Sequence, residues 1–258
     1  MIRELVDKFT GRLLLRVFGL AGSYSYSALL SALELRYIAE GRTQAAEKLW
    51  LAQAYPHLAE IEEQWLKDKA VTLPLGLPQS TLINKESWLG QDRRILFVCP
   101  RIKSSPAYYG AIYEQFKAAF GEFPHIIAGK QPVPVSDENV AGFVTDQCFH
   151  AWLKNCRVMF YHSREPRHLH YHPIEAMAFG MPVIYMKGGM LEKLAEGDQP
   201  GACETLDEAK EKVTRALEGD LNFIKAVKLS EKSILNKFKL DHTFPQWEKN
   251  FIGKVIQL

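Results

Sequence analysis

The chain has 258 residues, of which 47% are hydrophobic and 24% are charged, and its formal net charge is +2. This length allows one large or two small hydrophobic cores, and the composition excludes a disordered or fibrous protein. The small net charge provides no basic field of the kind that binds nucleic acid, so we expect no nucleic-acid partner. Any anion site must be built locally.

The compartment is indicated by the cysteines and by the hydropathy pattern. Cys99, Cys148, Cys156 and Cys203 lack C-x-x-C spacing, and three of them lie in or beside apolar, strand-like or helical runs, which predicts reduced thiols and a cytoplasmic protein. An uninterrupted apolar run of 18 residues is absent from the sequence, so we expect no transmembrane span. The amino-terminal segment also lacks the pattern of a signal peptide.

Residues 1–69 are predicted to be helical. Over residues 2–20, apolar residues recur at i, i+3 and i+4 with basic residues mostly on the other face, which is typical of an amphipathic helix. Such a helix docks on a core or lies on an anionic membrane, so a peripheral position at the inner membrane face stays open. Residues 27–65, with a break at 41–43, predict a helical hairpin.

Residues 70–91, rich in proline, glycine and polar residues, are expected to be a connector, and the periodicity changes after them. Continuous apolar runs then alternate with helical patterns, which predicts a parallel sheet covered on both faces and hence a Rossmann-like domain over residues 92–258. The expected strands are 94–99, 125–128, 139–144, 157–161 and 182–186, the expected helices are 108–120, 148–155, 174–179, 191–196 and 206–217, and a short segment covers 202–205.

The first strand of this domain is not followed by the glycine-rich dinucleotide fingerprint. The sequence CPRIKSSP stands at residues 99–106 where a G-x-G-x-x-G turn would be needed. A dehydrogenase is therefore disfavoured.

The most informative stretch is residues 161–186, in which a strand end, a histidine-rich loop, a helix and another strand follow one another. Pro173 suits the first turn of the helix, because proline needs no amide partner there. Glu175 in the same turn either complements the helix dipole or accepts hydrogen bonds from a ribose diol beside a phosphate. The spacing alone leaves these two roles open.

Residues 172–184, HPIEAMAFGMPVI, resemble the Glu-Ala-Met-Ala signature in the carboxyl-terminal domain of the GT-B glycosyltransferases of the retaining, glycogen-synthase-like group. Other segments agree in order with this family over about residues 70–258. They are the hinge-like 73–76, the strand and basic turn at 94–101, the glycine loop at 187–190, the segment 200–203 with the helix that follows, and the aromatic region around Phe244 and Trp247.

The resemblance implies transfer of a hexosyl group from a nucleoside diphosphate sugar to a glycan, lipid or small acceptor, with retention of configuration and without a metal or other cofactor. Glu175 would bind the ribose of the donor. Arg101 and Lys103 would neutralise the diphosphate, because a guanidinium fork and an ammonium both bind phosphate oxygens.

Two departures from the family limit this transfer of roles. The family's first glutamate lies eight positions before the second, where this chain has Arg167, while Glu165 lies ten positions before Glu175. A two-residue insertion in the loop could let Glu165 take the sugar-contacting role, and Tyr171 and His172, directly before Pro173, are further candidate contacts to the sugar or phosphate. The helical prediction for residues 1–69 also implies that the amino-terminal Rossmann domain is missing. We expect either a partner-dependent transferase, completed by another protein or a second copy, or a non-catalytic nucleotide-sugar-binding or scaffold protein.

Four histidines lie in the informative stretch, at positions 162, 168, 170 and 172. Alternate rings on one side of an extended segment could hold zinc if three or four ligands converged, which would suit a metal-dependent hydrolase. One or two of them could instead contact phosphate or sugar, and all four could be ordinary loop residues. His172, directly before Pro173, is the strongest candidate contact among them.

Overall fold

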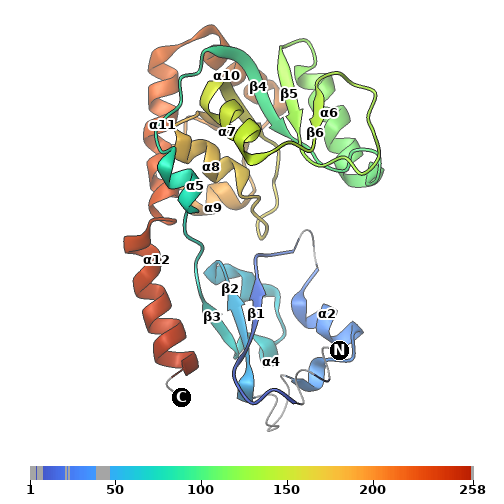
Figure 1. Cartoon of the computed structure of the whole chain (residues 1–258), viewed down its shortest axis with the longest axis vertical. Coiled ribbons are helices and arrows are strands. Elements are labelled where there is room, and N and C mark those ends of the chain that lie inside the picture. The colour runs from blue at the N-terminus through green and yellow to red at the C-terminus, as the bar shows by residue number, and fades with distance from the viewer. Residues whose placement is uncertain (1–3, 5–7, 21, 23, 39–46, 257–258) are drawn as a thin grey trace. The chain divides into compact units, whose positions relative to one another are not determined.

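The computed structural model describes residues 4, 8–20, 22, 24–38 and 47–256, and the chain divides into two compact units (Figure 1). Unit 1 comprises Met1–Gly76, Glu165–Leu169 and Lys237–Leu258, and unit 2 comprises Leu77–Arg164 and His170–Asn236. The loop 165–169 thus belongs to unit 1 although the residues on both sides of it belong to unit 2.

Unit 2 is built on a parallel sheet in which, among the described residues, six strands follow the order β6-β5-β4-β7-β8-β9. This order reverses direction between β4 and β7, as in the doubly wound Rossmann arrangement. The strands are β4 (Asp92–Val98), β5 (His125–Ala128), β6 (Val140–Gly142), β7 (Cys156–Tyr161), β8 (Val183–Met186) and β9 (Ala202–Cys203).

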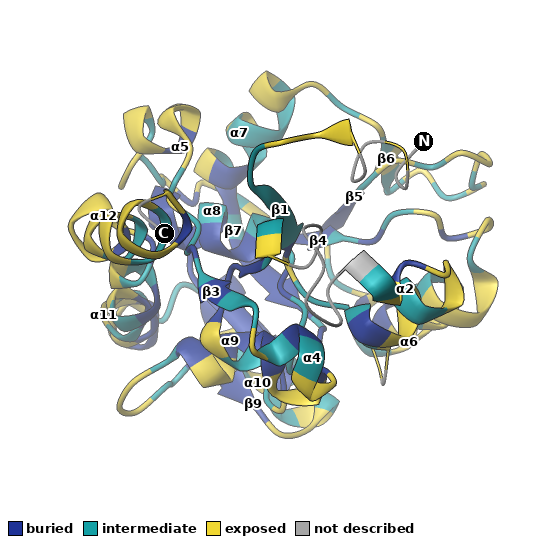
Figure 2. Ribbon diagram, turned by 90° about the horizontal axis from the view of Figure 1, so that it is seen from below, coloured by how far each residue is buried: buried dark blue, intermediate teal, exposed yellow. Residues whose placement is uncertain are grey.

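The central strands β4, β7 and β8 of the unit 2 sheet each bury a run of successive residues, which explains why those stretches are apolar rather than alternating. Phe97 and Phe160 face one side, where the Phe97 ring stacks on Phe116 with 4.0 Å between centroids. The alternate residues Leu96 and Met159 are fully buried as well. Figure 2 shows buried residues gathered in the strands and exposed ones on the outward turns of the helices.

The helices of unit 2 begin and end where local sequence signals place them. Helix α8 has Pro173 in its first turn and ends at Gly180, whose φ of 86° suits glycine. Helix α10 begins after Thr205, whose side chain accepts from the amide of Glu208. The helices are α5 (Gln79–Ile83), the π-type turn η3 (Pro106–Gly110), α6 (Ala111–Phe120), α7 (Asp146–Asn155), α8 (His172–Phe179), α9 (Met190–Leu194), α10 (Leu206–Glu218) and α11 (Leu221–Asn236).

The predicted Rossmann-like α/β fold is confirmed, and its predicted strands and helices correspond to β4 through α10. The predicted bounds of 92–258 differ from those of unit 2, because Glu165–Leu169 and Lys237–Leu258 belong to unit 1. The connector prediction was wrong in part, because β3 (Ala70–Thr72) and α5 lie within residues 70–91. Gly76 and Leu77 mark the change of unit, so the boundary itself falls inside the predicted segment.

Unit 1 contains a second parallel sheet, in which the described strands β1 (Leu13–Val17), β2 (Leu49–Gln53) and β3 follow the order β1-β2-β3. The other described elements are the short helices α2 (Tyr26–Ala32), η1 (Arg36–Ile38), η2 (Pro56–Ile61) and α4 (Gln64–Lys67), and the carboxyl-terminal α12 (Leu240–Trp247) with the π-type η4 (Glu248–Ile256).

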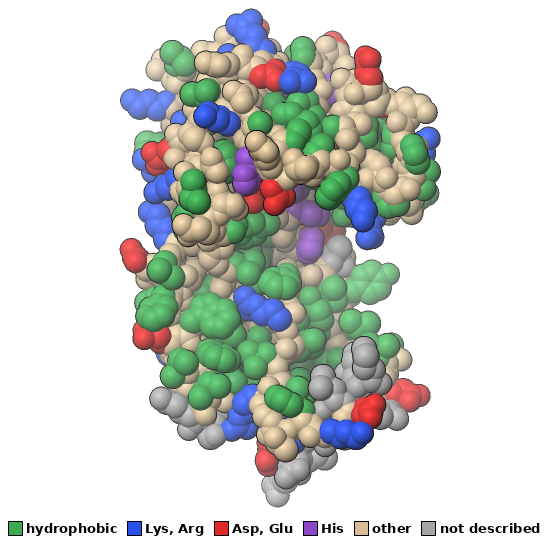
Figure 3. All heavy atoms as spheres, in the orientation of Figure 1, with side chains coloured by type: hydrophobic (Ala, Val, Ile, Leu, Met, Phe, Trp, Pro, Cys, Tyr) green, Lys and Arg blue, Asp and Glu red, His purple; other side chains and the backbone are tan. Residues whose placement is uncertain are grey.

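The carboxyl-terminal segment completes the core of unit 1. Val255 is fully buried against Ala52, Val71 and Leu73. Nε1 of Trp247 donates to the carbonyl of Pro74 across 2.9 Å. Figure 3 shows hydrophobic side chains gathered on one face of unit 1.

The prediction of a wholly helical region over residues 1–69 was wrong. Residues 13–17 and 49–53 form strands, because short apolar runs such as LLLRV and LWLAQ satisfy helical and strand patterns alike and pairing with a neighbour decides between them. The predicted break at 41–43 and most of residues 1–7 lie outside the described residues. The amino-terminal part is therefore a small α/β unit, and the ground for expecting no Rossmann-type domain there is removed.

Candidate functional site

The edge of the unit 2 sheet at the carboxyl ends of its strands gathers the polar residues singled out in the sequence. The chain runs outward in both directions from β4 and β7, whose carboxyl ends lie side by side at the point where the strand order reverses. Open α/β sheets bind ligands at this switch point. Cys99 to Lys103 follow β4 there, and His162 follows β7.

A pocket of about 170 Å³ lies at the carboxyl ends of β4, β5 and β6. This volume is below the ~300 Å³ at which whole-ligand pockets begin, so it suits one ring of a larger ligand. Gly129, with φ of 119°, closes one side, where an added Cβ would lie 2.8 Å from the nitrogen of Pro100. The lining residues are Val98, Ala128, Gly129, Lys130, Gly142, Phe143, Val144, Asp146 and Phe149.

Glu175 occupies the first turn of α8, as predicted, and is partly buried. Its Oε1 accepts from Oγ1 of Thr81 across 3.4 Å. Burial raises the pKa of Glu175, while His150 and the Thr81 hydrogen bond act to lower it and Asp146 acts to raise it. Asp146 also lines the pocket, so one of the charges that act on Glu175 belongs to a pocket residue.

Arg101 and Lys103 are exposed on the turn that follows β4. Arg101 has φ of 55°, a left-handed conformation that costs an arginine about 1–2 kcal/mol. Its amide donates to the carbonyl of Lys130, a pocket residue, across 3.0 Å. The strained turn therefore places the backbone of Arg101 beside a residue that lines the pocket.

Tyr161, at the end of β7, lies among three histidine rings. The centroid distances from its ring are 5.9 Å to His162, 6.0 Å to His170 and 5.5 Å to His172. Its Oη lies 3.3 Å from Nδ1 of His170 and also accepts from the amide of His170. The tyrosine thus brings together three of the four histidines that the sequence singled out.

His172 and Tyr171 lie at the entrance to α8. Burial lowers the pKa of His172 well below its ordinary value, with smaller contributions from His170 and His162. Burial also raises the pKa of the Tyr171 hydroxyl, as does the nearby Glu175. The amides of Ile174 and Glu175 both donate to the carbonyl of Tyr171, so the first turn already uses these two donors.

Glu165 belongs to unit 1 and is separated by this division from the other candidate residues. Its Oε2 accepts from the amide of Gly22 across 2.9 Å. Arg167, which stands where the family has its first glutamate, donates to the carbonyl of the same glycine. The sugar-contacting role of Glu165 stays a prediction.

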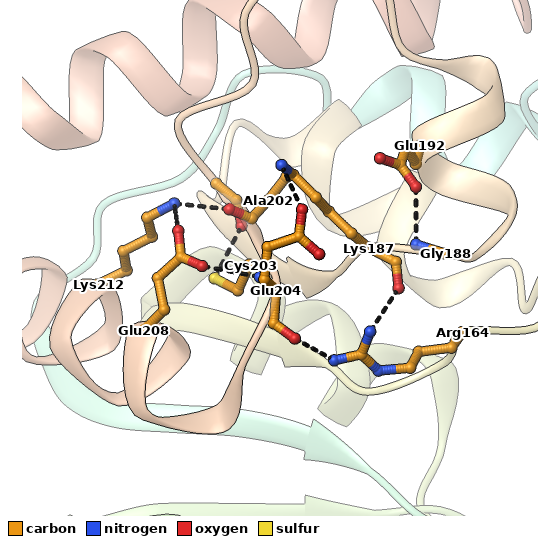
Figure 4. A network of polar contacts seen from close by, with 10 residues as sticks. Arg164, Lys187, Gly188, Glu192, Ala202, Cys203, Glu204, Glu208 and Lys212 are labelled. Carbon is orange, nitrogen blue, oxygen red and sulfur yellow. Dashed lines mark hydrogen bonds and ion pairs between the residues drawn. The ribbon is translucent and has the colours of Figure 1, made fainter.

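The loops after β7, β8 and β9 are fastened to one another by a polar network (Figure 4). Arg164 donates to the carbonyl of Lys187 across 3.1 Å, and Nζ of Lys187 lies 2.9 Å from Oε1 of Glu204. Glu192 accepts from the amide of Gly188 across 2.7 Å. These contacts fix the positions of the loops after β7, β8 and β9 relative to one another. The candidate ligand-binding residues lie after β4, after β7 and in α8.

Several site residues escaped the sequence analysis. Thr81, Asp146 and His150 surround Glu175 but lie 94, 29 and 25 positions away in the sequence, so only the fold brings them together. Phe143 and Phe149 of the pocket could have been suspected only from the helix start at Thr145, whose side chain accepts from the amide of Cys148.

The described residues provide neither a metal-binding cluster nor a membrane-spanning helix. Over residues 4, 8–20, 22, 24–38 and 47–256, no group of three or more histidine, cysteine, aspartate or glutamate residues is arranged to hold a metal ion. Within the same ranges, every helix is too short or too polar to cross a bilayer.

Neither a protein-family model nor a curated protein matches the chain. Solved structures do match it. HepE from Anabaena, in complex with UDP and glucose, superposes with a TM-score of 0.59 at 13% identity over 96% of this chain and 72% of its own.

Sucrose-phosphate synthase from Thermosynechococcus elongatus gives a TM-score of 0.59 at 14% identity over 95% of this chain and 68% of its own. The GtfA/B complex gives 0.54 at 12% identity over 98% of this chain and 55% of the matched chain. Since each likeness spans at least 95% of this chain, unit 1 is part of the matched fold. The chain therefore has the Rossmann-like GT-B fold of glycosyltransferases.

Proposed function

We propose that the chain is a glycosyltransferase that binds a nucleoside diphosphate sugar in unit 2 and transfers its hexosyl group to a glycan, lipid or small acceptor. The observation that carries the proposal is the placement of Glu175. Its partly buried carboxylate lies in the first turn of α8, the helix that follows β7 at the sheet edge where ligands bind, and it interacts electrostatically with Asp146 of the ring-sized pocket.

The pocket at β4, β5 and β6 would take the nucleobase. Phe143 and Phe149 offer aromatic faces for stacking, which contributes about 1–3 kcal/mol per base and tolerates different bases. The HepE structure contains UDP and glucose, which supports a uridine nucleotide as the first donor to try.

Glu175 would bind the ribose. A carboxylate accepts hydrogen bonds from two neighbouring hydroxyl groups, and Thr81 engages only Oε1. Among the described residues, Oε2 of Glu175 has no hydrogen-bond partner, so it can accept from the diol. Burial raises the pKa of Glu175, and a side chain that is partly buried beside a sheet edge is also placed to contact a bound ligand.

Arg101 and Lys103 would hold the diphosphate. They are exposed on the turn after β4, and Arg101 adopts a strained conformation of the kind found at ligand sites. Their positive charge would stabilise the negative charge that develops on the diphosphate as the bond to the sugar breaks, so the proposed transfer needs neither a metal ion nor another cofactor.

Transfer also requires an acceptor held against the sugar, because positioning contributes a large share of the rate. The acceptor would be bound by unit 1, by a protein partner or by a second copy of the chain. Transfer with retention, a cytoplasmic location and a position at the inner membrane face belong to the same proposal.

Titration calorimetry with UDP, ADP and GDP tests the proposal. We expect one of the three to bind with a Kd below 1 mM (~4 kcal/mol). Glu175→Ala should weaken that binding at least tenfold, while Glu211→Ala on the exposed face of α10 should leave it unchanged. Absence of binding by all three nucleotides would contradict the proposal. Binding without hydrolysis or transfer, with or without added partner, would favour a non-catalytic binding or scaffold protein.

A further inference from the structure

The imidazole ring of His162 has two buried nitrogen atoms. The residue follows β7 directly, and its ring packs edge-on against Phe97 of the adjacent strand β4, with 5.7 Å between centroids. Among the described residues, neither Nδ1 nor Nε2 has a hydrogen-bond partner, although both atoms are buried. Native proteins pair almost all such groups, so an unpaired one calls for an explanation.

The neighbouring rings do not supply the missing partner. The ring of His170 lies 6.4 Å from that of His162, and Tyr161 directs its hydroxyl to His170 instead. His162 as a whole has intermediate exposure, although both ring nitrogens are buried. Rotation about χ2, which is broad in histidine, is the movement by which a nitrogen would meet a ligand at the switch-point edge.

The chemistry of the ring indicates which ligand group it can bind. Burial, and to a smaller extent His170, lowers the pKa of His162 to about 4, so the ring is neutral near pH 7. A neutral imidazole has one donor and one acceptor nitrogen. A hydroxyl group both donates and accepts, so it can pair with either nitrogen, whereas a phosphate oxygen can pair only with the N–H donor.

The position of the His162 ring also favours a hydroxyl group of the sugar as its partner. Arg101 follows β4 and His162 follows β7, so the two residues lie on the two sides of the switch point. A diphosphate held at Arg101 would direct the attached sugar across this point. We propose that His162 is a specificity-determining residue that hydrogen-bonds a hydroxyl group of the transferred sugar.

This inference rests on the proposed function, and paired ligands separate the two. The probes are UDP-glucose, ADP-glucose and GDP-glucose, each measured by calorimetry against its own diphosphate. In His162→Leu we expect affinity for the best sugar nucleotide to fall about fivefold, the effect of one neutral hydrogen bond, and affinity for the matching diphosphate to stay within twofold. His162→Asn or His162→Gln, which keep one donor and one acceptor, should recover part of the loss.

The outcomes are distinct. If wild type and His162→Leu bind the sugar nucleotide equally well, the inference about His162 is overturned and the proposed function stays intact. If the wild type binds none of the diphosphates, both are overturned. Thermal unfolding provides a second arm. His162→Leu should keep or raise Tm because it removes an unpaired buried group, whereas His125→Leu should lower it because His125 bonds to the carbonyl of Phe123 at 2.7 Å. A fall in Tm for His162→Leu as large as that for His125→Leu would show that the ring is already satisfied and contradict the inference.

Discussion

Oγ1 of Thr81 donates to Oε1 of Glu175 across 3.4 Å and thereby joins α5 to the first turn of α8. The Thr81 side chain is fully buried, while Glu175 is only partly so. The threonine therefore orients a carboxylate that burial has made costly to ionise. A carboxylate kept at such a cost is typical of a binding site rather than of a stabilising surface charge.

The free-energy cost of ionising the partly buried Glu175 predicts that Glu175→Gln stabilises the protein in a pH-dependent way. Because the pKa of Glu175 is raised above its unfolded value of about 4.3, ionisation disfavours the folded state at any pH above the folded pKa. The penalty fades as the pH falls toward 4. We expect a higher Tm for Glu175→Gln than for wild type at pH 8, with the difference shrinking toward pH 4. Glu211→Gln on α10 is the control, and a lower Tm for Glu175→Gln at pH 8 would refute the prediction.

Two substitutions of Arg101 should differ in their effect on stability but not in their effect on nucleotide binding. With φ at 55°, Arg101→Gly should be more stable than Arg101→Ala by about 1 kcal/mol, because only glycine is unstrained there. Both variants lose the guanidinium and should bind the nucleoside diphosphate about tenfold more weakly than wild type. Urea unfolding and calorimetry measure the two effects. Unchanged nucleotide affinity in both variants would remove Arg101 from the diphosphate site.

Substitution of Phe143 tests whether the nucleobase of the donor binds in the pocket. Its side chain is 77% exposed yet lines the pocket at β4, β5 and β6, so Phe143→Ala should leave Tm nearly unchanged. Loss of stacking should weaken nucleotide binding about fivefold or more, the effect of about 1 kcal/mol. Leu221→Ala is the matched control, since Leu221 is 75% exposed on α11 and does not line the pocket. Equal affinities for the two variants would place the base elsewhere.

The carboxyl-terminal η4 predicts a contrast between neighbouring residues in unit 1. Val255 is fully buried beside Val71 and Leu73, whereas Ile256 is 53% exposed. Val255→Ala should lower the free energy of unfolding by about 2 kcal/mol, while Ile256→Ala should change it by less than about 0.5 kcal/mol. Similar losses for both variants in urea unfolding would mean that η4 does not complete this core.

The sequence predicted unit 2 well because its strands are continuous apolar runs separated by helices with clear starts, such as Pro173 in α8 and Thr205 before α10. It failed in unit 1, where β1 and β2 are short and gain their strand conformation from pairing with each other across 36 positions. No local pattern carries that information.

The site divides in a similar way. Glu175 could be assigned to a helix start from its neighbours in the chain, whereas Thr81, Asp146 and the pocket around Phe149 reach it only through the fold. The position of Glu165 could not be predicted from the sequence at all. A spacing of ten residues could not reveal that the loop 165–169 belongs to the other unit and bonds to Gly22.

The central claim, that Glu175 binds the ribose of a nucleotide donor, is tested most directly by comparing ribonucleoside and 2′,3′-dideoxynucleoside diphosphates on wild type and Glu175→Gln in calorimetry. We expect wild type to bind the ribo form at least tenfold more tightly, because two hydroxyl groups lose a charged acceptor in the dideoxy form. Glu175→Gln should reduce that ratio to about threefold or less while binding the dideoxy form as wild type does. An equal ratio in the two proteins would contradict the assignment of Glu175 and with it the proposed donor site.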